Sequence, residues 1–145
     1  MRTLVAIALC MAMAGAFAAD SYVTLSGVAY HFDKGHNYNW LTAGAGLELG
    51  VRENVRLAGG FYLNSNRNWS TYGAVVYLPF ARPLLEGTIR AGVIGALVTG
   101  YGRPITPAPG AALAYEMRGY GLNLIGVPSA DGSPAVLWIQ LKSRW

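Results

Sequence analysis

The sequence lacks several features on which other protein classes depend. Its single cysteine, Cys10, lies in a leader-like N-terminal segment, so we expect neither a disulfide framework nor a thiol nucleophile in the mature chain. Charged residues make up only 12% of the sequence, whereas roughly a quarter is usual in a soluble domain. These absences argue against a disulfide-rich module and against a secreted β-sandwich with a charged surface.

Long apolar runs are also missing. Hydrophobic residues make up 53% of the chain, yet beyond the N-terminal segment none of its stretches approaches the ~20 uninterrupted apolar residues of a membrane-spanning helix. Apolar residues nowhere keep a helical spacing for long. The composition and spacing together predict an all-β protein.

The N-terminal segment has the three parts of a secretory signal peptide. Arg2 supplies a positive charge, residues 4–13 form a short apolar run, and residues 16–18 provide a small-x-small cleavage pattern. We therefore expect residues 1–18 to be removed on export. Residues 19–145 then form one domain.

Alternation of side chains is clearest in the last stretch, residues 135–145. Leu137, Ile139 and Leu141 form an apolar row, while the intervening positions become polar towards the aromatic C-terminus. A strand of about ten residues with one apolar face, one polar face and an aromatic end is the unit of a membrane β-barrel. Such a strand needs partners on both sides, because lipid cannot satisfy an open sheet edge.

Seven further strand-like segments precede this one, and short connections alternate with longer polar or Pro-rich loops. Bacterial outer-membrane barrels have short periplasmic turns and longer outer loops. The sequence therefore predicts an eight-stranded antiparallel up-and-down transmembrane β-barrel with both termini in the periplasm, narrow enough to be filled by side chains or to hold one small ligand. The expected strands are residues 22–33, 40–51, 54–64, 69–78, 86–99, 111–117, 120–127 and 135–145, with residues 79–83 expected as one of the shorter connections.

Candidate catalytic residues gather at the expected outer ends of the first and third strands. His31 and Asp33 end the first strand, His36 follows in the next loop, and Asn64-Ser65 follow the third strand. A serine becomes a useful nucleophile when a base takes its proton, and histidine is the usual base. The topology brings either His31 or His36 towards Ser65. Alternatively, Asn64-Ser65 forms a turn and His31 fills the interior.

We expect neither a metal nor a cofactor, because two histidines and one nearby aspartate do not make a convincing metal site. The net charge of +4 comes without a basic cluster, which suits anionic lipid phosphates better than nucleic acid. Narrow barrels hold interior charges as ion pairs. We expect such pairs among Glu48, Arg56, Glu86, Arg90 and Glu116.

Two prolines flank neighbouring strands on the outer half of the expected barrel. Pro109 is expected just before the sixth strand and Pro128 just after the seventh. Because proline removes a ladder hydrogen bond, this pair predicts a gap in the barrel wall. The alternative is that each proline only ends a strand.

Several groups of residues, taken together, match the landmarks of one known family. They are Phe32-Asp33-Lys34 with Tyr38-Asn39, Gly44-Ala45-Gly46-Leu47, Phe61-Tyr62-Leu63-Asn64-Ser65 with Trp69, Gly119-Tyr120-Gly121, Val127-Pro128 and the aromatic terminus. In these landmarks the chain resembles the outer-membrane lipid A palmitoyltransferases, the PagP type. The resemblance implies a monomeric barrel in the outer membrane of a Gram-negative bacterium. It also implies transfer of an acyl chain from a phospholipid to lipid A of lipopolysaccharide, without a cofactor.

The family's catalytic set is a histidine on the first strand and an Asp-Ser pair after the third. Ser65 matches the serine, and Asn64 stands where the aspartate is expected. The family's histidine aligns with Gly27, and His31, four residues later, is the substitute. The resemblance implies that His31 acts as general base on Ser65 or on the acceptor hydroxyl. Asn64 is then expected to orient the base or to stabilise the oxyanion.

The same resemblance assigns substrate-binding positions. Val76 aligns with the interior position that fixes acyl length, and Pro109 and Pro128 match a lateral gap through which the acyl chain enters. Arg67 and Arg103, in outer loops, are expected to bind lipid phosphates. Two other functions stay open: a non-enzymatic barrel with a structural, binding or surface-exclusion role, and a lipid A deacylase.

Overall fold

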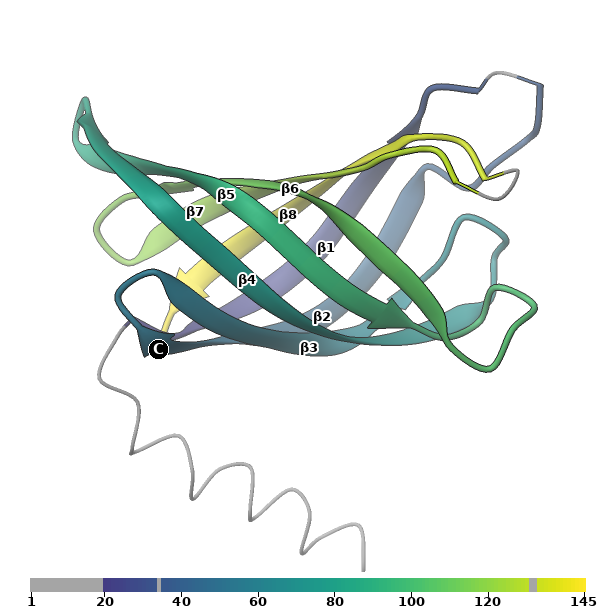
Figure 1. The fold of residues 1–145 in the computed structure, drawn as a ribbon, viewed down its shortest axis with the longest axis horizontal. Coiled ribbons are helices and arrows are strands. Elements are labelled where there is room, and N and C mark those ends of the chain that lie inside the picture. The colour runs from purple at the N-terminus through teal and green to yellow at the C-terminus, as the bar shows by residue number, and fades with distance from the viewer. Residues whose placement is uncertain (1–19, 34, 131–132) are drawn as a thin grey trace, which may run out of the picture.

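The computed structural model describes residues 20–33, 35–130 and 133–145, so the expected signal peptide lies outside the described residues. The expected all-β fold is confirmed: eight antiparallel strands close into one barrel, in which each strand pairs with its neighbours in sequence and β8 pairs with β1 (Figure 1). The strands are β1 Tyr22–His31, β2 Leu41–Arg52, β3 Val55–Leu63, β4 Trp69–Leu84, β5 Gly87–Val98, β6 Thr106–Glu116, β7 Tyr120–Val127 and β8 Val136–Arg144. In the described part of the chain, no helix is long and apolar enough to cross a membrane.

The two ends of the barrel differ in their connections, as expected. Short turns join β2 to β3, β4 to β5 and β6 to β7, and we call this the turn end; Asp20 and Trp145 lie there as well (Figure 1). Longer connections follow β1, β3, β5 and β7 at the opposite end, which we call the loop end. The first residues after β1 and β3 therefore meet at the loop end.

Two expected boundaries were wrong. β4 continues to Leu84, so residues 79–83 belong to the strand and pair with the start of β5. The register shifts between Tyr77 and Phe80, and this irregularity accommodates Pro79, which cannot donate a ladder hydrogen bond. The turn between the two strands lies at residues 85–86.

The second wrong boundary is the start of β6. This strand begins at Thr106 rather than at residue 111, so Pro109 lies inside β6 instead of before it. The segment from Thr106 to Gly110 pairs with β5, and the β6–β7 register begins only at Ala111. Proline is tolerated here because the side of β6 that faces β7 has no ladder to complete.

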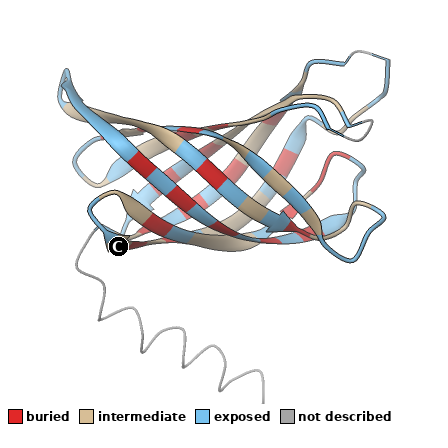
Figure 2. Ribbon diagram, viewed as in Figure 1, coloured by how far each residue is buried: buried red, intermediate tan, exposed pale blue. Residues whose placement is uncertain are grey.

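Alternation of buried and exposed residues separates the interior of the barrel from its outer face (Figure 2). Along β4, Ser70, Tyr72, Ala74, Val76 and Leu78 are buried while the residues between them are exposed. The apolar interior is built mainly from β3 to β7 and includes Tyr62, Tyr72, Ala74, Val76, Leu78, Ile94, Val98, Ala112, Ala114 and Ile125. The exposed face of the strands is largely apolar too, with Leu25, Leu47, Leu57, Phe61, Val75, Val93, Leu97 and Leu141 among its residues.

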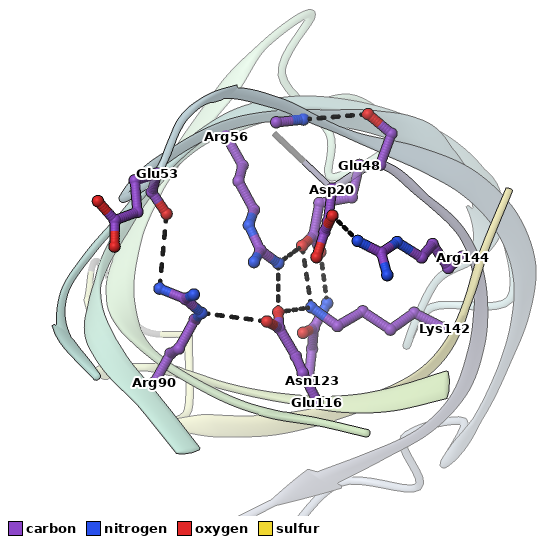
Figure 3. Close-up of polar contacts among 11 residues, drawn as sticks. Asp20, Glu48, Glu53, Arg56, Arg90, Glu116, Asn123, Lys142 and Arg144 are labelled. Carbon is purple, nitrogen blue, oxygen red and sulfur yellow. Dashed lines mark hydrogen bonds and ion pairs between the residues drawn. The ribbon is translucent and has the colours of Figure 1, made fainter. Parts of the chain in front are cut away.

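A buried ion-pair cluster occupies the interior (Figure 3). Arg56 and Lys142 each contact both Glu48 and Glu116, and Arg90 binds the second oxygen of Glu116 at 3.1 Å. The expected interior pairing is therefore confirmed for four residues. Glu86 does not belong to the cluster, because it lies exposed in the turn between β4 and β5. Lys142 joins it instead.

Candidate active site at the loop end of the barrel

A histidine–serine contact lies at the loop end. Nε2 of His31, the last residue of β1, is 2.6 Å from Oγ of Ser65, which follows β3. The contact is partly buried, and only 8% of Ser65 is exposed. In the tautomer that carries its proton on Nδ1, the imidazole accepts the serine hydroxyl proton at Nε2. This is the geometry in which a histidine activates a serine.

His31 points into the barrel because β1 contains a bulge. Tyr22, Thr24 and Ser26 face inward at even positions, whereas Ala29 is the next fully buried residue. The register with β8 runs from Ser26–Gln140 to Val28–Ile139, which leaves Gly27 as the extra residue. A bulge of this kind shifts the alternation by one residue. The inward row continues through Ala29 to His31. Gly27, the residue that aligns with the histidine of the palmitoyltransferases, is itself the bulge.

Asn64 does not contact His31. Its side chain is fully buried, and its amide nitrogen donates to Oγ of Ser70 and to the carbonyl of Gly100, both at 2.9 Å. Its side-chain oxygen accepts the backbone N–H groups of Asn66 at 2.9 Å and Asn68 at 3.0 Å. These four bonds use the hydrogen-bonding capacity of the amide. Asn64 therefore shapes the turn that presents Ser65, and the expected interaction with the base is not seen.

His36 lies in the loop after β1 and pairs with Asp33 rather than with Ser65. Its Nδ1 is 3.2 Å from Oδ2 of Asp33, and both side chains are exposed. The hydrogen bond from the backbone N–H of Gly35 lowers the pKa of the Asp33 carboxyl below its usual value, and the hydrogen bond with His36 adds a smaller effect in the same direction. Among the described residues, no carboxylate forms a hydrogen bond or ion pair with His31. The contact is thus a candidate dyad in which His31 can serve as the base.

The β6–β7 ladder stops early on the same half of the molecule, and we call this unpaired stretch the open seam. Their register ends at the pair Ala111–Gly126, although both strands continue further towards the loop end. Two more steps of the same register place Pro109 opposite Pro128. Neither proline has an N–H group to donate across the seam. The β6–β7 ladder therefore stops before the two prolines: Pro109 lies inside β6, and Pro128 directly follows the end of β7.

An apolar groove of about 660 Å³ lies at this open seam and extends across β8 to β1. Its lining consists of Phe32, Val93, Pro109, Gly110, Ala111, Gly126, Val127, Pro128, Ala135, Val136 and Leu137. Within this lining, Val127 pairs with Val136, and Val136 pairs with His31. Laterally paired side chains lie about 5 Å apart. Two valines thus connect the open seam with the histidine of the dyad.

Sequence patterns do not single out Val127 and Val136 as a pair. The signal is their register across β7, β8 and β1, and that register requires the closed barrel. In the sequence, Tyr38 and Asn39 are only landmarks of the family resemblance, yet in the fold both lie against the dyad. Tyr38 stacks on the imidazole of His31, and the backbone N–H of Asn39 donates to the carbonyl of Ser65 at 2.8 Å.

The remaining expected residues occupy three separate positions. Arg67 is exposed in the β3–β4 loop, and its guanidinium donates to the carbonyl of Asn37 at 3.3 Å. Arg103 is exposed in the β5–β6 loop. Val76 is buried in the interior, where it pairs with Arg56 on β3 and Ile94 on β5. The two arginines lie at the loop end with the dyad, and Val76 lies in the wall of the apolar interior.

A serine and a histidine in this arrangement can support acyl transfer. In the part of the chain that the structure describes, no group of three potential metal ligands is present. His31 can take a proton from Ser65, and the adjoining apolar groove can hold a hydrocarbon chain next to that pair. Comparison of this sequence with models of known protein families and with curated proteins finds no match to either.

Proposed function

We propose that this protein is an outer-membrane acyltransferase that moves an acyl chain from a phospholipid to lipid A. One observation carries the proposal: the His31–Ser65 dyad lies at the end of a row of inward-facing valines that begins at an open, apolar seam in the barrel wall. A lipid in the membrane has direct lateral access to such a seam. Its ester group can then reach the dyad without leaving an apolar environment.

Membrane placement is supported by the outer face of the barrel. Exposed Leu, Val and Phe side chains surround its middle, which is costly in water and favourable in lipid. Exposed aromatic residues lie near both ends, with Trp40 and Trp69 at the loop end and Tyr120 and Trp145 at the turn end. The leader pattern in residues 1–18 fits export to the outer membrane. We propose that the barrel works there as a monomer.

In the proposed reaction, Nε2 of His31 takes the hydroxyl proton of Ser65 while Oγ attacks the ester carbonyl of the phospholipid. The ester C–O bond breaks, and His31 returns the proton to the leaving oxygen, which releases a lysophospholipid and leaves an acyl-serine. A lipid A hydroxyl then gives its proton to His31 and attacks the acyl carbonyl. The bond to Oγ breaks, Ser65 recovers its proton, and the acyl chain is on lipid A. One ester replaces another, so the overall reaction needs no cofactor.

The location of the dyad suits lipid A as acceptor. Lipid A is in the outer leaflet, and the dyad lies at the loop end, which faces outward in barrels of this topology. Arg67 and Arg103 are exposed in loops at that end, where a guanidinium can bind a phosphate through two parallel hydrogen bonds.

The proposal is tested by mass spectrometry of lipid A from bacteria that express the wild-type protein, Ser65→Ala or His31→Ala. We expect one added acyl mass with the wild type and none with either variant. Folding of each variant is checked by its heat-modifiable mobility on gels. Unchanged lipid A in the presence of folded wild-type protein would refute the transferase and favour a non-enzymatic barrel.

A lipid A deacylase is the second candidate, and the His31–Ser65 contact itself favours it, because the same dyad can pass the acyl group to water. The two enzymes give opposite mass changes, since a deacylase removes an acyl mass from lipid A. Purified protein in mixed micelles separates them further. The transferase releases lysophospholipid stoichiometrically with acylated lipid A, whereas the deacylase releases free fatty acid from lipid A.

A further inference from the structure

Two adjacent residues of the loop between β1 and β2 contact the two halves of the dyad. The ring of Tyr38 lies parallel to the imidazole of His31, with centroids 4.5 Å apart and an angle of 17° between the planes. The other partner of Tyr38 is His36, whose ring is 5.4 Å away and tilted. Tyr38 is itself only partly exposed. One face of the catalytic imidazole is therefore covered by a stacked ring.

Asn39 ties the same loop to the serine. Its backbone N–H donates to the carbonyl of Ser65 at 2.8 Å, and its side-chain amide donates to the carbonyl of Asn64 at 3.3 Å. The amide also donates to the carbonyl of Leu41 at 2.6 Å, which fixes Asn39 to the start of β2. The turn that carries Ser65 is thus held from outside by one residue of another loop.

We propose that Tyr38 and Asn39 are positioning residues for the dyad: Tyr38 fixes the ring of His31, and Asn39 fixes the backbone of Ser65. Their effect on turnover rests on the proposed function, whereas their effect on the geometry of His31 does not. Neither residue is a catalytic residue, because neither exchanges a proton or a bond with substrate.

The need for such residues follows from the composition of the site. In a Ser-His-Asp triad, a buried carboxylate holds the imidazole in one tautomer and one orientation. Here the side chain of Asn64 is fully used by its bonds to Asn66, Asn68, Ser70 and Gly100, and Asp33 is engaged by Gly35 and His36. In place of a carboxylate, the ring of His31 has a backbone hydrogen bond with Ala29 and the stacked ring of Tyr38. A small loss of alignment between base and nucleophile lowers the rate steeply.

The first test is nuclear magnetic resonance of histidine-labelled protein in detergent micelles. The sequence contains only two histidines, and a His36→Gln variant assigns their signals. Tyr38→Leu should change the tautomer balance of His31 and shift its titration midpoint, while Tyr38→Phe, which keeps the stacked ring, should behave like the wild type. Tyr30→Leu is the matched control, because Tyr30 is exposed on the opposite face of β1. Unchanged tautomer and midpoint in folded Tyr38→Leu would overturn the role of Tyr38.

The second test follows the reaction of Ser65 with a fluorophosphonate, which labels activated serines without any lipid. Asn39→Ala keeps the backbone N–H but removes both side-chain bonds that hold Asn39 against Leu41 and Asn64. It should slow labelling by about tenfold or more, while Asn37→Ala should not, because Asn37 is exposed and contributes its backbone carbonyl to Arg67. Equal labelling of folded Asn39→Ala and wild type overturns the positioning role of the Asn39 side chain. If wild-type Ser65 is not labelled at all, the catalytic part of the inference fails.

Lipid A mass spectrometry separates this inference from the proposed function. Altered His31 signals in Tyr38→Leu, together with a wild type that leaves lipid A unchanged, support the positioning role and reject the transferase. Acyl transfer by the wild type, together with unaltered His31 signals in folded Tyr38→Leu, rejects the positioning role and supports the transferase.

Discussion

Ser65 and His31 are 34 positions apart in the chain, yet a distance of only 2.6 Å separates Oγ of Ser65 from Nε2 of His31. The up-and-down order of the strands brings them to the same side, because β1 and β3 both end at the loop end. Residues that exchange one proton are expected to act as a unit rather than independently. This relationship makes the first prediction quantitative.

Ser65→Ala and His31→Ala should each lower acyl transfer by about 100- to 10,000-fold, which is the usual contribution of general-base catalysis. The double variant should transfer acyl chains about as fast as the less active of the two single variants, since either change already disables the proton transfer. Initial rates of lysophospholipid release in mixed micelles give the three values. Losses that multiply in the double variant would show that the two residues act separately.

Replacement of the other histidine should have little effect. His36 is exposed and pairs with Asp33, so His36→Gln should keep transfer within a few-fold of the wild type, whereas His31→Gln should abolish it. The same rate assay distinguishes the two histidines. A large loss of activity with His36→Gln, but not with His31→Gln, would show that His36 in the loop, and not His31 on β1, is the base.

The groove at the seam offers a direct way to block lipid entry. A Cβ atom added at Gly126 meets no atom within 4 Å, so Gly126→Phe should be tolerated and should fill the groove that this residue lines. We expect transfer to fall by about tenfold or more, because the phospholipid ester is then misplaced relative to Oγ of Ser65. Lysophospholipid release measures this loss.

Gly73→Phe is the matched control for that variant. Gly73 also has open space around an added Cβ, but it lies on the exposed face of β4 and does not line the groove. Its activity should equal that of the wild type. Similar losses in both variants would mean that bulk on the outer face, rather than closure of the seam, causes the effect.

Much of the fold could be predicted from alternation and loop length, because each strand buries one face and exposes the other. Topology alone predicted that His31 or His36 approaches Ser65, and it left the choice between the two histidines open. The direction of His31 did not, since it depends on the bulge at Gly27. A signal for the bulge exists in the sequence: the outward apolar row moves from odd positions at Val23 and Leu25 to even positions after Gly27.

Other features could not be predicted because they depend on register or on three-dimensional saturation of polar groups. Asn64 was expected to orient the base or stabilise the oxyanion, but its four hydrogen bonds hold the turn that carries Ser65. Lys142 reaches Glu48 from a strand 94 residues away, and its sequence neighbours give no sign of this pairing. The extension of β4 through two prolines required a shift of register that local propensity does not encode.

Val76 provides a prediction about acyl length. It is buried in the apolar interior, with only 7% of its surface exposed. Val76→Gly removes three carbon atoms from that wall and should allow a longer acyl chain, with a shift in the preferred donor among phospholipids of graded length. Val75→Gly makes the same change on the outer face, where Val75 is 51% exposed, and should not alter the preference. If Val76→Gly leaves selectivity unchanged, this residue does not limit chain length.

The interior ion cluster predicts an asymmetric effect on stability. Three cations, Arg56, Arg90 and Lys142, surround two carboxylates, Glu48 and Glu116. Glu116→Gln leaves a single carboxylate among three cations, of which Arg56 and Lys142 are buried, and removal of one partner from a buried ion pair typically costs about 3–5 kcal/mol. Lys142→Met removes the surplus positive charge and fills the same volume with an apolar side chain. We therefore expect it to cost less than half as much.

Denaturant unfolding in detergent micelles, followed by tryptophan fluorescence, measures both free energies of unfolding. The comparison is informative because the two variants break contacts in the same cluster. Lys142 Nζ also lies 4.4 Å from the centroid of the Tyr22 ring, and Lys142→Met replaces this cation–π contact with apolar packing. Equal destabilisation by Glu116→Gln and Lys142→Met would mean that the number of broken contacts, and not the balance of buried charge, sets the stability of the cluster.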